Sequence, residues 1–414
     1  MTGRPVAANI TAFDISPYES NALNTGKKPV IATVAVDTYE ENAVNSALER
    51  LFDLLGSPSL FFKAGQTVAL KPNLLMAAAP EQAITAHPTV ISAAADICLS
   101  QGAKVKIVDS PGSGTPWNES SLRKLYAKCG IESLAQQNVE LNFNTAVRKA
   151  PCPEGKLVRS FELIEAALDV DVLISISKAK THSFTIMTNA VKNLFGLVPG
   201  FDKPGFHARM KNPENFSEML VDLAGLAKPA LTIVDAIIGM EGDGPTSGSP
   251  RKFGFLLAST NLHALDVAVA HVMNIDPLRV PTIAAAKKRG LTTGIFTDIE
   301  ILGDKDALTP IEDFVPPRTI GGTGLGMAGF LVSLLSPVLK RMFVLKPVPV
   351  KSLCVGCGAC QDACPNLAVT VESGKAKIKR DQCILCYCCN EVCPHDAMKL
   401  KGSILYKLFH KVYR

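Results

Sequence analysis

The sequence predicts an α/β protein: a mainly parallel sheet with flanking helices, followed by a small C-terminal α+β domain. Two observations support this prediction. Apolar runs alternate with helical segments between residues 30 and 320, and nine of the 12 cysteines gather between residues 354 and 393. Strands that alternate with helices are typical of parallel sheets.

The predicted strands are short, apolar and rich in β-branched residues, at residues 30–36, 67–70, 105–108, 170–176, 231–235 and 253–258. The predicted helices place apolar residues at helical spacing, at residues 40–55, 89–100, 120–129, 262–273 and 282–289. Because the run at 170–176 is almost wholly apolar, we expect that strand to be buried on both faces.

With 414 residues, the chain exceeds one ordinary domain. We divide it into an N-terminal lead-in at 1–29, an α/β domain at 30–320, an apolar and Pro-rich linker at 321–350, a cysteine-rich domain at 351–402 and a basic tail at 403–414. The net charge of +5 is mild, and no long basic block precedes the tail, so nucleic-acid binding is not indicated.

Membrane insertion is not expected, because the apolar part of the linker is too short to span a bilayer and contains Pro337. The linker reads as a helix packed on the main domain or as an interfacial helix edged by Lys340 and Arg341, and the packed helix is favoured. The basic tail leaves peripheral contact with a membrane or an acidic partner open. The free thiols and the lack of a signal-peptide pattern predict a cytoplasmic location.

The cysteines form two identical runs of the type C-x2-C-x2-C-x3-C-P, offset by 29 residues. This run is typical of two-cluster bacterial ferredoxins, in which the fourth cysteine of each run binds the other cluster. The spacing therefore predicts two [4Fe-4S] clusters with crossed ligands. One is held by Cys354, Cys357, Cys360 and Cys393, and the other by Cys383, Cys386, Cys389 and Cys364.

Disulfides and zinc are the alternatives. Zinc sites usually show two separated C-x2-C pairs rather than three cysteines in a row of threes, so both alternatives fit poorly. Cys388 departs from the pattern. It either replaces Cys389 as a ligand or is a spare thiol, and the regular spacing favours Cys389 as the ligand.

Polar residues follow the carboxyl ends of the predicted strands, the edge at which open α/β sheets bind ligands. They are Lys71, Asn73, Asp109, Lys178, Lys180, His182, Asp235 and Glu241. The G-S-G at residues 112–114 follows a predicted strand but is not a complete G-x-G-x-x-G run, and no P-loop is present, so the glycine-rich segments are weak evidence for nucleotide binding.

The stretches around these positions resemble the domain-of-unknown-function three-sixty-two family, which is often fused to a ferredoxin domain. The matching stretches include Lys71-Pro72-Asn73, Asp109-Ser110-Pro111, residues 177–182, residues 189–196 and residues 235–245. The resemblance covers roughly residues 30–300 and implies an iron–sulfur protein, but it brings no settled reaction or substrate. The cysteine-rich domain in turn resembles two-cluster bacterial-type ferredoxins.

The lysines at these positions indicate an anionic ligand, because ammonium groups clamp carboxylates and phosphates. We assign His182, Lys178 and Lys180 to catalysis, since a histidine titrates near neutral pH. The alternatives are a structural or hydrogen-bonding role for His182 and His207, and a solvated surface position for each lysine taken alone. The substrate-binding candidates are Lys71, Asn73, Asp109, Asn189, Lys192, His207, Asp235 and Glu241.

Two functions remain open, and the sequence leaves it uncertain whether the protein is an enzyme. The first is a redox-coupled enzyme that passes electrons between the clusters and an anionic substrate or second cofactor. The second is a non-enzymatic electron carrier or maturation partner that binds a redox partner protein. In a third reading, the clusters are structural.

Overall fold

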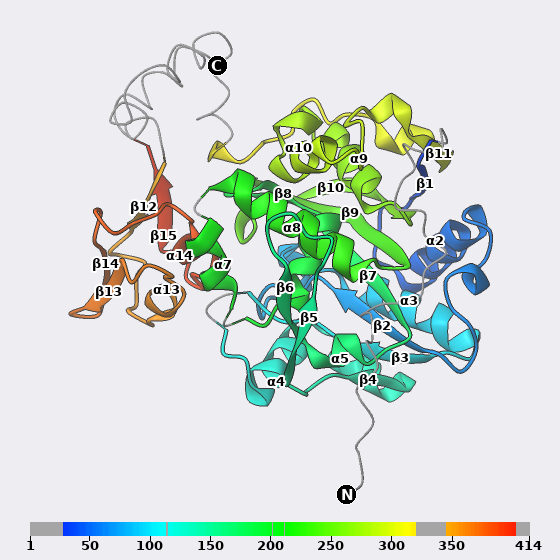
Figure 1. Cartoon of the computed structure of the whole chain (residues 1–414), viewed down its shortest axis with the longest axis horizontal. Coiled ribbons are helices and arrows are strands. Elements are labelled where there is room, and N and C mark those ends of the chain that lie inside the picture. The colour runs from blue at the N-terminus through cyan, green and yellow to red at the C-terminus, as the bar shows by residue number, and fades with distance from the viewer. Residues whose placement is uncertain (1–27, 113–114, 201, 211, 320–344, 403–414) are drawn as a thin grey trace, which may run out of the picture.

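The structure, a computed structural model, describes residues 28–112, 115–200, 202–210, 212–319 and 345–402. A mixed sheet of nine strands forms the centre of this described part of the chain (Figure 1). From one edge to the other the strands are β11 (Glu300–Gly303), β1 (Val30–Ala35), β10 (Ser247–Ser259), β9 (Leu231–Asp243), β7 (Val172–His182), β2 (Thr67–Pro72), β3 (Lys104–Ile107) and β4 (Val139–Leu141). The ninth strand, β8 (Ile186–Thr188), pairs with β7.

Most pairings in this sheet are parallel, as the sequence predicts. Strands β9, β7, β2, β3 and β4 run parallel in series, and β11 is parallel to β1. Strand β10 is antiparallel to both of its neighbours. Every residue of β7 is buried, which explains the continuous apolar run at its start.

Helices cover both faces of the sheet, and each face has its own apolar core. One core contains α2 (Glu41–Leu54), α3 (Pro88–Ser100) and α4 (Glu119–Lys128). The other contains α5 (Glu165–Leu168), α6 (Ala190–Asn193), α7 (Lys203–Met210), α8 (Pro213–Ala227), α9 (Leu262–Val272) and α10 (Pro281–Lys288). The hairpin of β5 (Val147–Pro151) and β6 (Ser160–Ile164) packs into this second core.

Local sequence signals explain where several helices begin. His87 caps α3, because its Nδ1 accepts a hydrogen bond from the Thr89 N–H, and Pro88 occupies the first helical position. Asn212 caps α8 in the same way, followed by Pro213. The sequence therefore contains start signals for both helices.

The cysteine-rich unit, residues 345–402, lies beside the α/β part and repeats its own elements (Figure 1). Its first half contains β12 (Lys346–Pro349), α13 (Ala359–Asp362) and β13 (Val369–Glu372), and its second half β14 (Lys375–Ile378), α14 (Cys388–Glu391) and β15 (Met398–Lys401). Each element recurs at the offset of 29 residues that separates the cysteines. The two halves interlock, because β12 pairs with β15 and β13 with β14.

The structure corrects the predicted ends of three strands. β7 continues to His182 and β9 to Asp243, and β2 ends at Pro72. The following residues therefore lie within strands instead of following them: Lys71, Lys178, Lys180, His182, Asp235 and Glu241. β7 continues because Lys180 and His182 pair with β8, and β9 continues because it forms a long ladder with β10. Within the described ranges, no helix is both long and apolar enough to cross a bilayer. The lead-in, most of the linker and the tail lie largely outside the described residues.

Candidate functional site

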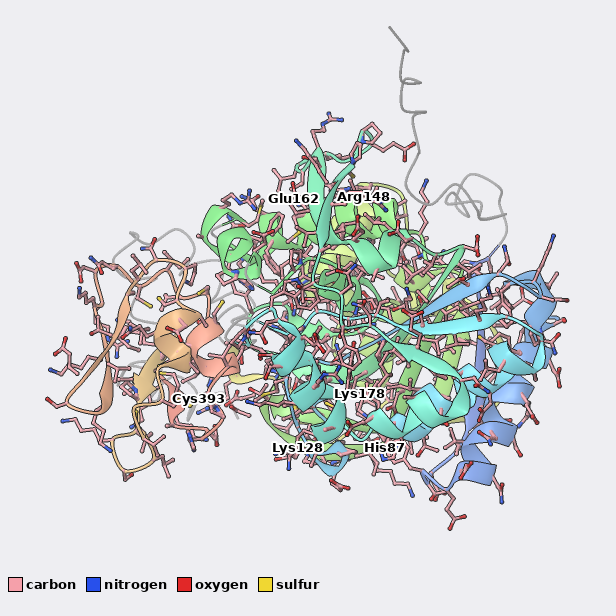
Figure 2. The ribbon with its side chains drawn as sticks, turned by 90° about the horizontal axis from the view of Figure 1, so that it is seen from below. His87, Lys128, Arg148, Glu162, Lys178 and Cys393 are labelled. Atoms are coloured by element: carbon pink, nitrogen blue, oxygen red, sulfur yellow. The ribbon has the colours of Figure 1, made fainter. Side chains whose placement is uncertain are left out.

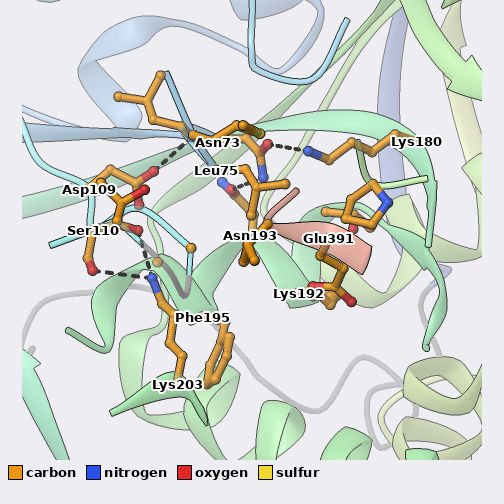
Figure 3. A pocket seen from close by; sticks show the side chains of 18 of the residues that line it. Asn73, Leu75, Asp109, Ser110, Lys180, Lys192, Asn193, Phe195, Lys203 and Glu391 are labelled. Atoms are coloured by element: carbon orange, nitrogen blue, oxygen red, sulfur yellow. Dashed lines mark hydrogen bonds between the residues drawn. The ribbon is translucent and has the colours of Figure 1, made fainter. Parts of the chain in front are cut away.

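A cavity of about 90 Å³ lies at the carboxyl edge of β7, β2 and β3, where the cysteine-rich unit meets the sheet (Figure 3). Its walls come from the α/β part, apart from Glu391 and Val392, which belong to α14 and the residue after it. Among the lining residues, four are lysines and two are acids: Lys71, Lys180, Lys192, Lys203, Asp109 and Glu391. This is the sheet edge at which the sequence predicts a ligand site.

Lys71 and Asp109 form a buried ion pair, with 2.7 Å between Nζ and Oδ1 and side-chain exposures of 1% and 3%. The second carboxylate oxygen of Asp109 accepts the Leu74 N–H at 2.8 Å. Asn193 extends this network, because its Nδ2 donates to Ser175 Oγ and its Oδ1 accepts from Asn73. The pair is therefore electrically balanced and held rigidly.

Lys180 has neutral acceptors instead of a carboxylate within the described residues. Its Nζ donates to Asn73 Oδ1 at 2.8 Å and to the Ile84 carbonyl at 2.5 Å. Burial lowers the pKa of Lys180 well below the ordinary lysine value, and the neighbouring Lys192 and Lys178 lower it further. Such a lysine releases its proton more readily than a solvated one.

Lys203 is the fourth lysine of the cavity, and it donates to the Ser110 and Pro111 carbonyls at 2.7 and 2.6 Å. Burial lowers its pKa to about 7. Because carbonyl groups surround the ammonium, Lys203 holds the loop after β3 in place.

Lys192 and Glu391 both line the cavity and lie close together in Figure 3. Burial lowers the pKa of Lys192, and Glu391 opposes that shift. Burial raises the pKa of Glu391, and Lys192 and Lys180 oppose that shift. The described residues provide Lys192 with this electrostatic partner but with no hydrogen-bond acceptor.

His182 lies behind Glu391, with 3.4 Å between Nε2 and the Glu391 Oε1. Its Nδ1 accepts the Phe184 and Thr185 N–H groups, so the neutral imidazole carries its proton on Nε2, toward the carboxylate. Burial lowers the pKa of His182 well below the ordinary histidine value. His182 is therefore placed to position Glu391.

His207 lines the cavity from α7 and is neutral, because burial lowers its pKa to about 3. Its ring stacks on Phe216 with 4.3 Å between centroids and also contacts Phe184. Its Nδ1 has no hydrogen-bond partner among the described residues, and neither has the Oγ1 of Thr188 on the cavity wall.

The structure places Lys178 and Asp235 in a second polar cluster, away from the cavity lining. Lys178 Nζ is 2.7 Å from Asp235 Oδ2 and 2.9 Å from the Tyr39 hydroxyl, which in turn donates to Asp235. The Tyr39 and His87 rings stack at 3.6 Å, and the His87 N–H binds Asp235. Figure 2 shows Lys178 inside the α/β part and Cys393 in the cysteine-rich unit.

Two other predicted binding residues also lie away from the cavity lining. Asn189 donates to the Leu265 carbonyl and accepts from Ser177, which ties α6 to α9 and β7. Glu241 accepts the Val315 N–H on the outer side of β9. Of the three residues assigned to catalysis, Lys180 lines the cavity, His182 contacts Glu391 behind it, and Lys178 belongs to the second cluster.

Several thiols of the cysteine-rich unit lie close together. Cys354, Cys357, Cys360 and Cys393 line a common cavity. Burial raises the pKa of the Cys389 thiol, and four neighbouring thiolates raise it further: Cys386, Cys383, Cys364 and Cys360. Backbone N–H groups of Ala376, Ala368 and Ala397 point at the sulfurs of Cys354, Cys364 and Cys393. Grouped thiolates with N–H donors on sulfur fit an iron–sulfur cluster.

Cys388 is buried, its thiol is hydrogen-bonded to Cys386, and that bond together with burial raises the pKa of Cys388. In the other half of the repeat its position is taken by Ala359, whereas Cys389 corresponds to Cys360. The repeat therefore gives Cys388 no equivalent among the predicted ligands.

Sequence reasoning missed Lys203, Thr188 and Glu391 as cavity residues. A signal for Glu391 existed, since it lies between Cys389 and Cys393, but its equivalent, Asp362, is exposed to solvent. Only the docking of the cysteine-rich unit distinguishes the two acids.

An α/β domain joined to a cysteine-rich unit of this spacing defines an iron–sulfur protein of the electron-transfer class. Residues 68–271 match the family described as "Domain of unknown function (DUF362)", and residues 353–397 match the "4Fe-4S dicluster domain". A thylakoid-associated protein of Synechocystis sp. is 34% identical over 306 residues, which cover 71% of this chain and 92% of that protein. The chain belongs to the DUF362 family.

Two solved structures are similar at low identity. The lactate racemase apoprotein of Thermoanaerobacterium thermosaccharolyticum is 16% identical with a TM-score of 0.36, over 59% of this chain and 56% of that one. A Thermotoga maritima protein solved by structural genomics is 14% identical with a TM-score of 0.30, over 53% and 55% of the two chains. The chain thus spans little more than half the length of either.

Proposed function

We propose that the protein is an iron–sulfur oxidoreductase with an α/β domain at 30–320 and a ferredoxin domain at 351–402. The ferredoxin domain holds two [4Fe-4S] clusters on the crossed cysteine sets, and the α/β domain binds a small anionic substrate in the cavity. When bound, such clusters supply single-electron transfer. One observation carries the proposal: the cavity wall includes Glu391 and Val392, which lie in sequence between Cys389 and Cys393.

The lysines of the cavity bind and polarise the substrate in this proposal. Lys192 has no hydrogen-bond acceptor among the described residues, so its ammonium is available to an anion. Lys180 adds a second ammonium, and its lowered pKa suits it to supply a proton to a substrate that gains electrons. His182 acts through Glu391 as a positioning residue.

The first half of the ferredoxin domain is proposed to meet the redox partner protein. Cys357 is exposed, whereas its equivalent in the second half, Cys386, is only partly exposed. Leu353, Val355 and Leu367 are also exposed in the first half, at 46%, 60% and 76%. Exposed apolar residues of this kind are typical of a protein contact surface.

The test uses the full chain with reconstituted clusters, reduced anaerobically and freed of excess reductant. It is mixed with a panel of small carboxylates and other oxyanions, and visible absorbance follows reoxidation. We expect one class of anion to accelerate reoxidation, and Lys180→Met to slow it by about 100-fold or more, the usual contribution of a general acid. Lys252→Met, at an exposed ion pair with Asp37, is the matched control.

The carrier function makes the opposite prediction. A carrier would be reoxidised by a partner protein and by none of the small anions. That outcome, with Lys180→Met indistinguishable from the control, would reject the enzyme.

Peripheral membrane contact is a separate proposal. The tail that predicts it lies outside the described residues, and the Synechocystis relative is named as thylakoid-associated. Flotation with anionic vesicles, with and without residues 403–414, tests it. Equal flotation of both forms would reject a role for the tail.

A further inference from the structure

The cavity has an excess of positive charge. Among its described lining residues, the Lys71–Asp109 pair is balanced, which leaves Lys180, Lys192 and Lys203 against the single carboxylate of Glu391. Unpaired ammonium groups are costly away from water. An anion that enters the cavity removes that cost.

Two polar atoms on the described cavity wall also lack partners. Thr188 Oγ1 and His207 Nδ1 are buried without a hydrogen bond among the described residues, in side chains that are 3% and 5% exposed. Buried polar groups without a partner are rare in folded proteins, and they point to a ligand or water in that place.

The size of the cavity limits that ligand. An apolar cavity of roughly 150 Å³ accepts benzene, which has six non-hydrogen atoms. At about 90 Å³, and open on one side, this cavity suits an anion of comparable or smaller size. Acetate, oxalate and phosphate fall in this range.

The Glu391 carboxylate lines the cavity in which such an anion would bind. It lines the same cavity as Lys180 and Lys192, with one oxygen 3.4 Å from His182 Nε2. Its equivalent in the first half of the repeat, Asp362, is exposed to solvent at the same position of α13. The two acids thus occupy equivalent positions in the repeat, but only Glu391 lies against the α/β part.

We infer that the cavity binds a small oxyanion on Lys180 and Lys192, and that Glu391 weakens this binding because its carboxylate competes for the same ammonium groups. The inference gives the chemical class of the proposed substrate. It rests on the proposed function only in treating the bound oxyanion as a substrate. Binding itself requires no electron transfer.

Calorimetric titration of the oxidised, cluster-loaded full chain tests the inference. The probes are acetate, oxalate and inorganic phosphate, with acetamide as the uncharged analogue of acetate. We expect one oxyanion site per chain and no binding of acetamide. Lys192→Met should weaken binding at least tenfold, and Glu391→Gln should tighten it at least tenfold.

Matched variants separate these effects from damage to the fold or the clusters. Asp362→Asn removes the equivalent acid on the solvent side and should leave affinity unchanged. Thr188→Val keeps the shape of the side chain and should weaken binding without loss of a charge. Iron content and the fluorescence of Trp117 show that each variant is loaded and folded.

Three results would overturn the inference: no oxyanion binds, Lys192→Met binds as the wild type does, or Glu391→Gln and Asp362→Asn behave alike. Preference for oxalate or acetate over phosphate identifies a carboxylate, and the reverse preference identifies a phosphate. Binding without reoxidation of the reduced protein would reject the proposed enzyme and leave the site standing.

Discussion

Replacement of Asp235 by asparagine tests whether Lys178 is held by a structural ion pair. Asp235 accepts hydrogen bonds from Lys178, the Tyr39 hydroxyl and the His87 N–H. The side chains of Lys178 and Asp235 are 1% and 0% exposed. Asparagine preserves the shape and removes the charge, so Lys178 is left as an uncompensated buried cation. We expect the free energy of unfolding to fall by about 3–5 kcal/mol.

The loss should depend on pH in a defined direction. Burial lowers the pKa of Lys178 and Asp235 raises it, so Asp235→Asn lowers that pKa further. A lysine whose pKa is lower in the folded state binds fewer protons there than in the unfolded chain. Stability therefore rises with pH between the folded pKa and the ordinary lysine value of 10.5. The deficit of the variant should shrink as pH is raised above neutrality.

Urea unfolding followed by Trp117 fluorescence measures this loss. Trp117 is the one tryptophan in the sequence, and it packs against both cores of the sheet. The control is Asp37→Asn, which breaks a pair with Lys252 whose side chains are 70% and 60% exposed. Exposed pairs contribute little to stability, because water and salt screen them. An equal loss in both variants, or a deficit independent of pH, would refute the structural role of the buried pair.

Two further predictions concern the clusters and the cavity. If the ligands are crossed, Cys357→Ser with Cys393→Ser affects one cluster and leaves about four of about eight irons, whereas Cys357→Ser with Cys364→Ser disturbs both. Iron and sulfide assays with EPR distinguish this from uncrossed ligands, which would reverse the two results. Gly196→Ala should cost about 1–3 kcal/mol by overpacking and weaken oxyanion binding, because its Cβ would collide with Asp109 and Lys71. Unchanged stability and binding would contradict the close packing at Gly196.

The sequence predicted the sheet and most of its helices because their signals are local. The apolar start of β7 and the His87-Pro88 entry to α3 are examples. The sequence analysis did not predict helix α8, although the Asn212-Pro213 start signal and a regular apolar face indicate it. The continuation of β7 through Lys178 and Lys180 has no such local signal. Polar residues remain in that strand because Asp235 and Asn73, which are distant in sequence, provide their partners.

The site was predictable in part for the same reason. Lys71 lies in β2, Lys180 in β7 and Lys192 in α6, and the structure brings them to a common cavity. Lys178 lies two residues from Lys180 on the same strand, but it forms an ion pair with Asp235 and belongs to a separate cluster. Spacing along the chain places side chains at an edge. It does not determine which of them find an internal counter-ion.

That distinction identifies which lysines are available to a ligand. Lys71 and Lys178 each contact a buried carboxylate at 2.7 Å, so their charges are compensated inside the fold. Lys180 and Lys192 have no ion pair within 4.0 Å in the described part of the chain, and burial lowers the pKa of both. Buried cations without a counter-ion destabilise a fold, and apolar residues of similar volume would stabilise it. Lys180 is such a buried cation, and Lys192 is partly buried beside Glu391. An anion that binds both ammonium groups is therefore the best explanation of this pair of lysines.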